Sequence, residues 1–166
     1  GMDRYLITTA SALHDIGKVA IDDRILSAHD LTPEQTAILH THPILGAQML
    51  ENLSQYQDEP LVKFAIQICR WHHERWDGSG YPDGRKGDDI PIAAQVVALA
   101  DAYDGLTGKR DKHEALSQEE AVAELTAGKH GAFNPLLLEC LRDVEDRLAE
   151  ETEGDTTPPP EKRNSL

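Results

Sequence analysis

Residues 72–82 of this chain read HHERWDGSGYP, two adjacent histidines followed by a segment rich in glycine and proline. Apolar residues recur at helical spacing through residues 60–73, which predicts a helix that ends on the two histidines. Glycine and proline then recur through residues 77–91, which predicts a loop. Neutral imidazole is the commonest nitrogen ligand of transition metals. His72 and His73 are therefore candidate metal ligands at the junction of a helix and a loop.

Other candidate ligands occur at wide intervals along the chain: His14, Asp15, His42 and Asp101. His42 stands directly before Pro43, which lacks the amide that a continuous helix needs and so marks a helix break. Asp101 lies in a strongly apolar helix predicted over residues 92–106, where a carboxylate is rarely buried without a partner. Four histidines and two aspartates are more than one tetrahedral ion needs. The set predicts a centre with more than one metal, of the kind that hydrolyses phosphate esters.

Helical patterns account for most of the remaining chain. Thr32 and Gln35 form a predicted capping box around Pro33, and Ser117 and Glu120 form a second one. Further helices are predicted over residues 5–15, where Gly17 stops the helix, over residues 43–53, from the second capping box to near residue 128, and over residues 134–150. No segment alternates as a strand for more than four residues.

The expected fold is therefore all-α, a compact helical bundle that forms one domain over residues 1–150. Residues 151–166 contain three consecutive prolines, several acidic residues and one apolar residue, so this tail is expected to be disordered.

Composition limits the choice of partners and compartment. The net charge of −14 argues against a nucleic-acid polymer as partner, but it leaves room for a small phosphate substrate beside a metal cluster. No apolar stretch is long enough to span a membrane, and no signal peptide is visible. Cys69 and Cys140 are isolated within apolar helical patterns, which predicts small core side chains rather than a disulfide. A reducing cytoplasm is the expected location.

Four ordered motifs resemble those of a known family. They are His14-Asp15-Ile16-Gly17-Lys18, His42-Pro43-x-x-Gly46, the run over 72–82, and Asp101-x-x-Asp104-x-Leu106-Thr107. Together they look like the HD-GYP domain, a bacterial branch of the HD metal-dependent phosphohydrolases, over roughly residues 5–147. The resemblance implies a bundle of the HD-domain type and hydrolysis of cyclic di-GMP. It also implies one or two divalent transition metal ions, such as iron or manganese.

The resemblance implies a role for each candidate ligand. Asp15 would bridge two metals, and the second metal would also take the three histidines His42, His72 and His73. The first metal would take His14, Asp15, Asp101 and a histidine from a helix upstream of the His-Asp motif. Because His14 lies only fourteen residues from the first residue, we expect this chain to lack that helix and the first site to be short of one ligand.

Substrate contacts are also implied by the resemblance. Lys18 would place a cation on the phosphate as a catalytic residue, although a lysine near a helix end is also favoured by the helix dipole. Arg110 would bind phosphate or guanine, but Asp111, Lys112 and His113 follow it, where the family usually has Pro, Tyr and a basic residue. Tyr81 borders the site in the family, and its loop serves either for contacts to substrate and partner domains or as a turn that holds the two histidines.

Two more departures from the family's pattern concern supporting or substrate-side positions. Gln95 stands where an arginine is usual, and Asn134 stands where an aspartate is common. The expected partners are a cyclic dinucleotide, an upstream sensor or receiver domain, and a second copy of the chain in a homodimer. One alternative is a degenerate module that binds metal, nucleotide or a protein without hydrolysis. Another is an HD phosphohydrolase for a different nucleotide, against which the glycine-rich loop before Pro82 argues.

Overall fold

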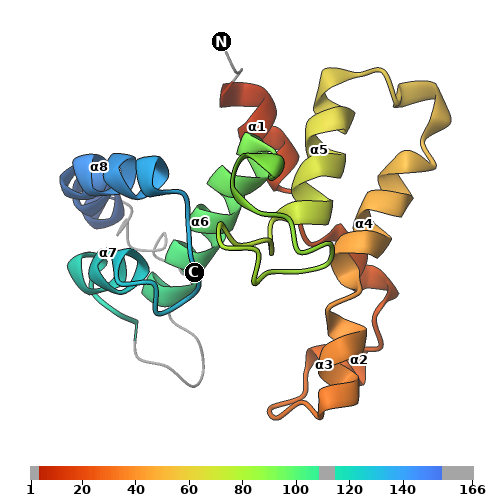
Figure 1. The fold of residues 1–166 in the computed structure, drawn as a ribbon, viewed down its shortest axis with the longest axis horizontal. Coiled ribbons are helices and arrows are strands. Elements are labelled where there is room, and N and C mark those ends of the chain that lie inside the picture. The colour runs from red at the N-terminus through yellow and green to blue at the C-terminus, as the bar shows by residue number, and fades with distance from the viewer. Residues whose placement is uncertain (1–3, 109–114, 155–166) are drawn as a thin grey trace, which may run out of the picture.

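The computed structural model describes residues 4–108 and 115–154, with side chains described up to Glu145 (Figure 1). The α-helices are α1 (Arg4–Ser11), α2 (Asp23–Leu26), α3 (Pro33–Leu39), α4 (His42–Glu51), α5 (Pro60–Trp71), α6 (Ile92–Thr107), α7 (Gln118–Thr126) and α8 (Pro135–Gly154). Short 3-10 helices η1 (Ile16–Ala20), η2 (Ser54–Tyr56) and η3 (Gly87–Asp89) lie between them. In these two ranges the extended pairing is limited to one bridge between Lys129 and Gly131. The all-α prediction is confirmed.

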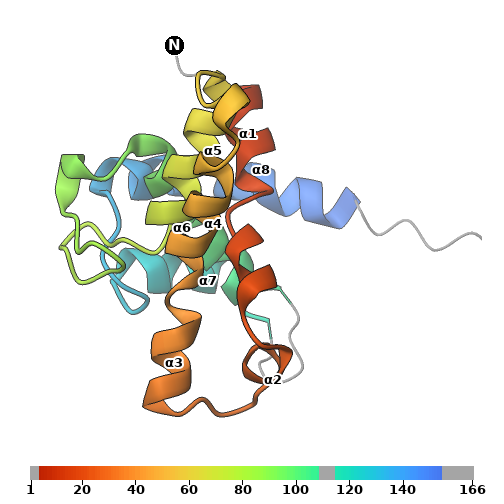
Figure 2. The ribbon, with the colours of Figure 1, turned by 90° about the vertical axis from the view of Figure 1, so that its right-hand side faces the viewer.

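Helix α6 runs through the middle of the molecule and separates two hydrophobic cores (Figures 1 and 2). On one side α1, α4 and α5 pack on α6, and the buried side chains include Ala47, Ile68 and, from α6, Val97. On the other side α7 and α8 pack on α6 through Leu99, Leu125 and their neighbours. The apolar face on both sides of α6 explains why its sequence reads as strongly hydrophobic. Helices α2 and α3 project away from this body (Figure 2).

The predicted helix starts are confirmed where a capping side chain was present. Thr32 and Gln35 form a capping box at α3, and Ser117 and Glu120 form one at α7. Each box satisfies amide groups that the first helical turn leaves free. The break at Pro43 is also confirmed, because α3 ends at Leu39 and α4 begins at His42.

The first helix ends earlier than predicted. It stops at Ser11, and residues 12–15 continue as turns with hydrogen bonds three residues back, from Leu13 N to Ala10 O at 3.0 Å and from His14 N to Ser11 O at 3.1 Å. Gly17 therefore does not terminate a helix. It lies in η1 against α4, where a Cβ atom would collide with the backbone of His42 and Gly46. This close crossing holds the His14-Asp15 pair beside the start of α4.

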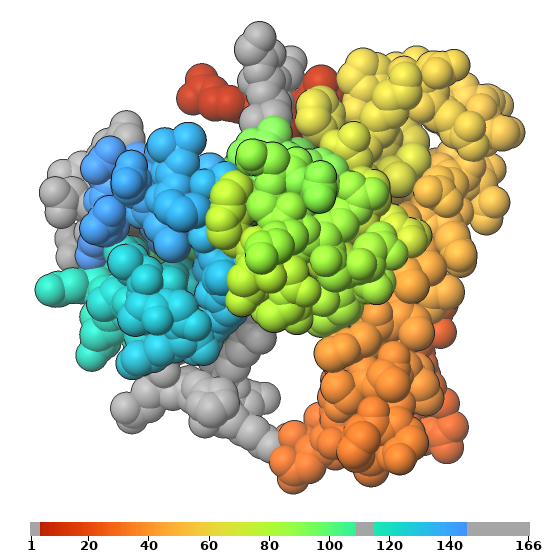
Figure 3. All heavy atoms as spheres, viewed as in Figure 1, coloured from red at the N-terminus to blue at the C-terminus, as the bar shows by residue number. Residues whose placement is uncertain are grey.

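The loop after α5 forms a lobe at the centre of one face of the molecule (Figure 3). It confirms the loop predicted over residues 77–91, apart from the single turn of η3. Helix α8 continues to Gly154, one turn past its predicted end. The rest of the predicted tail, residues 155–166, lies outside the described residues. Within the described chain we find no helix with the length and apolar character of a membrane span.

The two cysteines differ in their surroundings. Both are free thiols, as predicted. Cys69 is fully buried in α5, where its thiol donates a hydrogen bond to the carbonyl of Leu13 at 3.0 Å. Cys140 is exposed on α8, so its prediction as a core side chain is wrong. Helical periodicity placed Cys140 among the leucines, but it lines an open pocket between α6 and α8 rather than the core.

Candidate metal centre

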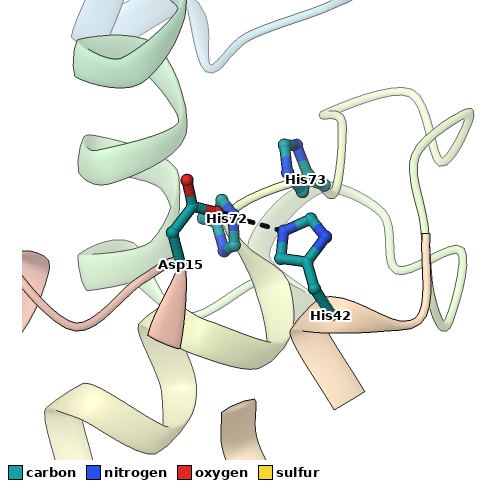
Figure 4. Close-up of side chains that lie close together, drawn as sticks. All are labelled: Asp15, His42, His72 and His73. Atoms are coloured by element: carbon teal, nitrogen blue, oxygen red, sulfur yellow. Dashed lines mark ion pairs between the residues drawn. The ribbon is translucent and has the colours of Figure 1, made fainter. Parts of the chain in front are cut away.

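Four predicted ligands meet at one point (Figure 4). They are Asp15, His42, His72 and His73, and one ligand atom from each lies within 4.8 Å of all the others. Asp15 comes from the turn after α1, His42 begins α4, and His72 and His73 follow the last turn of α5. Three segments far apart in the sequence therefore deliver one carboxylate and three imidazoles to a single site.

Backbone carbonyls fix the orientation of the imidazole rings. The Nδ1 atom of His42 lies 2.7 Å from Leu39 O, and Nδ1 of His72 lies 2.9 Å from Ile68 O. A carbonyl oxygen can only accept, so each Nδ1 carries the proton and each Nε2 carries a lone pair. This arrangement is common for histidines that bind a metal, because the second hydrogen bond sets the tautomer.

The lone pairs of these rings point at an otherwise unsatisfied position. His42 Nε2, His72 Nε2 and Asp15 Oδ1 are all buried without a hydrogen-bond partner. His42 Nε2 lies 3.2 Å from Asp15 Oδ1, and two lone pairs at that distance repel unless a cation or an extra proton lies between them. A divalent cation among these atoms would satisfy all three, so this donor set fits a metal ion.

His14 and Asp101 extend the cluster on the side of α6. His14 Nε2 lies 3.4 Å from Asp15 Oδ2 and 3.8 Å from Asp101 Oδ1, while its Nδ1 lies 2.7 Å from Ser11 O. The Asp101 side chain keeps 39% of its surface exposed, so it is less buried than its apolar neighbours suggested. The structure thus brings all six predicted ligands together, with Asp101 more exposed than the buried His42 and His72.

Electrostatics keep the donor atoms available to a cation. Burial would raise the pKa of Asp15, but contacts from His14, His42 and Lys18 outweigh it and hold that pKa below its usual range. Burial and the neighbouring His14 lower the pKa of His72 to about 4. Burial and His72 lower the pKa of His73 to about 2. Near neutral pH the centre therefore offers an ionised carboxylate and two unprotonated imidazoles.

Lys18 lies at the edge of the cluster. Its Nζ atom donates to Asp15 Oδ2 at 2.5 Å, so in this structure the lysine neutralises the carboxylate predicted to bridge two metals. The side chain is 39% exposed, which leaves it accessible to a ligand. Lys18 stands in the last turn of the 3-10 helix η1. Its position is compatible with a contact to a phosphate and with a favourable interaction with the helix dipole.

Tyr81 lies between two histidine rings. It stacks on His73 with ring centroids 4.7 Å apart and on His40 with centroids 3.9 Å apart. Gly80 allows this approach, because a Cβ atom there would collide with the backbone of residues 73–75. The loop therefore touches a candidate ligand directly. The sequence did not predict the contact of His40 with Tyr81.

Glu74 holds the loop next to the candidate ligands, a role that the sequence analysis missed. It is only 2% exposed, and its two carboxylate oxygens accept the amides of Asp83 at 2.8 Å and Arg85 at 3.0 Å. Asp83 in turn accepts from Arg70 Nε and from Trp71 Nε1. A buried acid directly after two candidate ligands was the available signal, since it needs donors from the following loop. These bonds fix the loop to the end of α5.

Arg110, predicted to bind substrate, lies outside the described residues. Of the remaining histidines in the described chain, His29 is exposed and His130 lies 2.7 Å from Glu124 Oε2. Neither belongs to the metal cluster.

Comparison with known proteins agrees with this geometry. The family described as "HD domain" matches residues 3–136. A "Probable cyclic di-GMP phosphodiesterase" of Vibrio cholerae is 44% identical over 133 residues, covering 78% of this chain and 30% of the relative. A "3'3'-cGAMP-specific phosphodiesterase 2" of the same organism is 42% identical over 144 residues, covering 86% of this chain and 27% of the relative. A "Cyclic di-GMP phosphodiesterase" of Thermotoga maritima is 35% identical over 154 residues, covering 90% of this chain and 41% of the relative.

This chain spans less than half the length of each of these relatives. The match nevertheless includes the turn with His14-Asp15, the start of α4, the end of α5 and all of α6, so it covers every element that supplies a candidate ligand. On this agreement of sequence, helical fold and clustered histidines and aspartates, the chain belongs to the HD domain family.

Proposed function

We propose that this chain is a metal-dependent phosphodiesterase that hydrolyses a cyclic dinucleotide, with cyclic di-GMP as the substrate. The observation that supports it best is the convergence of His42 Nε2, His72 Nε2 and Asp15 Oδ1, three buried atoms without partners that aim at one point. Buried polar atoms rarely remain unpaired unless they serve a ligand. Relatives named as cyclic di-GMP phosphodiesterases supply the substrate class.

The residues divide into two ligand sets. Asp15, with one oxygen toward His42 and the other toward His14, would contribute to both sets. His42, His72 and His73 complete one set, and His14 and Asp101 contribute to the other. Divalent ions such as iron or manganese, when bound there, lower the pKa of water and polarise a phosphoryl oxygen. The protein fixes the tautomers of the imidazole rings in advance, so the site needs little reorganisation during the reaction.

Lys18 has a proposed part in the reaction. In this structure its ammonium group pairs with Asp15. If cations neutralised Asp15, Lys18 would be free to bind a non-bridging phosphate oxygen, where its ammonium group would stabilise the charge that develops in the transition state. Tyr81 stacks on His73 and is proposed to hold that imidazole in place and to contact the substrate.

Binding of a cyclic dinucleotide without hydrolysis is the second candidate. It is favoured by the wider His14–Asp101 pair, which lies outside the group of four atoms that meet within 4.8 Å. A chain that fills one metal site would retain nucleotide affinity and lose the second ion needed for efficient attack. Association with an upstream sensor or receiver domain, and with a second copy of the chain, stay predictions.

The experiment is a hydrolysis and binding assay on manganese- or iron-loaded protein with cyclic di-GMP and 3'3'-cGAMP. We expect a linear dinucleotide product from wild-type protein and loss of product with His42→Ala. His29→Ala is the matched control, because His29 is exposed and lies outside the cluster. Tight binding with no product would favour the second candidate. No binding and no product from the metal-loaded chain would contradict both.

A further inference from the structure

A polar pocket of about 340 Å³ opens beside the metal centre on the side away from α1. Its wall is formed by Arg75, Asp101, Ala102, Gly105, Leu106 and His130. Asp101 is shared between this pocket and the ligand cluster, since its carboxylate also lies 3.8 Å from His14 Nε2. A ligand that occupies this pocket therefore lies beside both Arg75 and Asp101.

Arg75 is held rigidly by its surroundings. Its guanidinium lies 5.0 Å from the centroid of the Phe133 ring, and its Nη1 donates to the carbonyl of Glu74 at 3.1 Å. Gly131 leaves room for the arginine stem, because a Cβ atom at that position would strike the side chain of Arg75. A guanidinium fixed by stacking and one hydrogen bond presents its other donors in a constant direction, which suits recognition of a phosphate.

Charge pairing distinguishes Arg75 from Arg24 and Arg70. Arg24 pairs with Asp22 and Arg70 pairs with Asp83. Arg75 forms no ion pair with any carboxylate in the described part of the chain, although it is half-buried. The acids that act on it from a distance are Asp101, Asp77 and Glu74. Glu74 accepts hydrogen bonds from loop amides, and Asp101 belongs to the candidate metal centre. The guanidinium of Arg75 therefore keeps donors that can bind a ligand.

We propose that Arg75 is a substrate-binding residue whose guanidinium binds a phosphate oxygen of the cyclic dinucleotide in this pocket. The role depends on the proposed function for the identity of the substrate. It gives the site a second cation besides Lys18 for a substrate that carries two phosphates. It would also supply, from within the helix-end motif, anion recognition that does not rely on Arg110.

A purely structural role is the alternative, since the side chain packs on Phe133 and Gly131. The two roles differ in what a substitution changes. Arg75→Gln keeps part of the aliphatic stem and removes the charge. Loss of a phosphate contact lowers affinity for phosphate ligands, whereas loss of packing lowers thermal stability and metal content instead.

The test is calorimetric titration of manganese-loaded protein with cyclic di-GMP and, separately, with inorganic phosphate. We expect Arg75→Gln to weaken both by at least about tenfold, the scale of one charge-assisted hydrogen bond, with metal content unchanged. Arg85→Gln is the matched control, because Arg85 belongs to the same loop but stacks on Trp71 and donates to Asp89 O.

The inference is overturned if Arg75→Gln binds phosphate as tightly as wild type, or if Arg85→Gln weakens it equally. Failure of the proposed function looks different. In that case wild-type protein neither binds nor cleaves cyclic di-GMP, while the phosphate titration still separates Arg75→Gln from wild type. If Arg75→Gln fails to retain metal, Arg75→Lys repeats the comparison with the charge kept, and unchanged phosphate affinity in that variant contradicts recognition by a guanidinium fork.

Discussion

Asn134 Nδ2 donates a hydrogen bond to Gln95 Oε1 at 2.8 Å, which joins the residue before α8 to the first turn of α6. Gln95 Nε2 donates in turn to the carbonyl of Ile90 at 2.7 Å. These are two positions at which the sequence departs from the family pattern, where arginine and aspartate are common. Because the two side chains contact each other, the two departures amount to one coupled exchange, and they support the fold rather than contact substrate.

Replacement of Gln95 by leucine should destabilise the protein without affecting the metal centre. The substitution leaves Asn134 Nδ2 and the Ile90 carbonyl without their partner at a site where Gln95 is only 8% exposed. Loss of a buried hydrogen-bond partner costs about 1–3 kcal/mol. Urea unfolding measures this difference, and Gln55→Leu at an exposed position is the matched control. Equal stability of the two variants would show that the pair contributes nothing.

The ion pair between Arg70 and Asp83, which fixes the loop to α5, predicts a pH dependence of stability. Hydrogen bonds from Arg70 lower the pKa of Asp83 in the folded protein, with a further contribution from Trp71. The pKa of an unfolded aspartate is about 3.9. A depressed folded pKa therefore gives stability that is present above about pH 4 and is lost as the pH falls through the folded value.

The measurement is the difference in unfolding free energy between wild type and Asp83→Asn from pH 6 to pH 3. We expect wild type to lose its advantage over the variant as the pH decreases. The difference isolates Asp83 from other carboxylates, such as Asp15, that are present in both proteins. A constant difference across this range would mean that the ion pair does not stabilise the loop.

Asp101 should matter for metal binding and hydrolysis but not for folding. Asp101→Ala removes the α6 carboxylate beside His14, so we expect weaker binding at the more open site. Hydrolysis should fall by roughly a hundredfold or more, as when a charge-stabilising group is removed. Asp104→Ala is the control, since Asp104 lies one turn further along α6 and is exposed. Unchanged rate and metal stoichiometry in Asp101→Ala would make Asp101 a structural residue.

Local signals in the sequence predicted most of the fold. Thr32 and Ser117 start helices through their own side chains, and Pro43 breaks one through its missing amide, so these features need no knowledge of distant residues. The end of α1 was misplaced because it depends on the contact of Gly17 with α4, which only the folded chain provides.

In the candidate site, too, local sequence features were predicted and contacts between distant segments were missed. Residue types and ordered motifs identified six candidate ligands, and the structure brings these side chains into one cluster. The contact of His40 with Tyr81 was missed because it joins the end of α3 to a loop about forty residues later, and nothing in either segment specifies the pairing. Glu74 was missed although its neighbours were singled out, because its burial depends on how the following loop folds back over α5.

Anomalous diffraction from crystals of the metal-loaded protein, with elemental analysis, tests the account most directly. It predicts a well-filled ion bonded to Asp15, His42 Nε2, His72 Nε2 and His73, at about 2.0–2.2 Å from nitrogen and oxygen ligands. It also predicts a weaker or empty position between His14 and Asp101, which is more open. Two equally filled positions would contradict this ranking. Absence of an ion at the four-residue site, or one that persists in His42→Ala and His72→Ala, would contradict the metal centre itself.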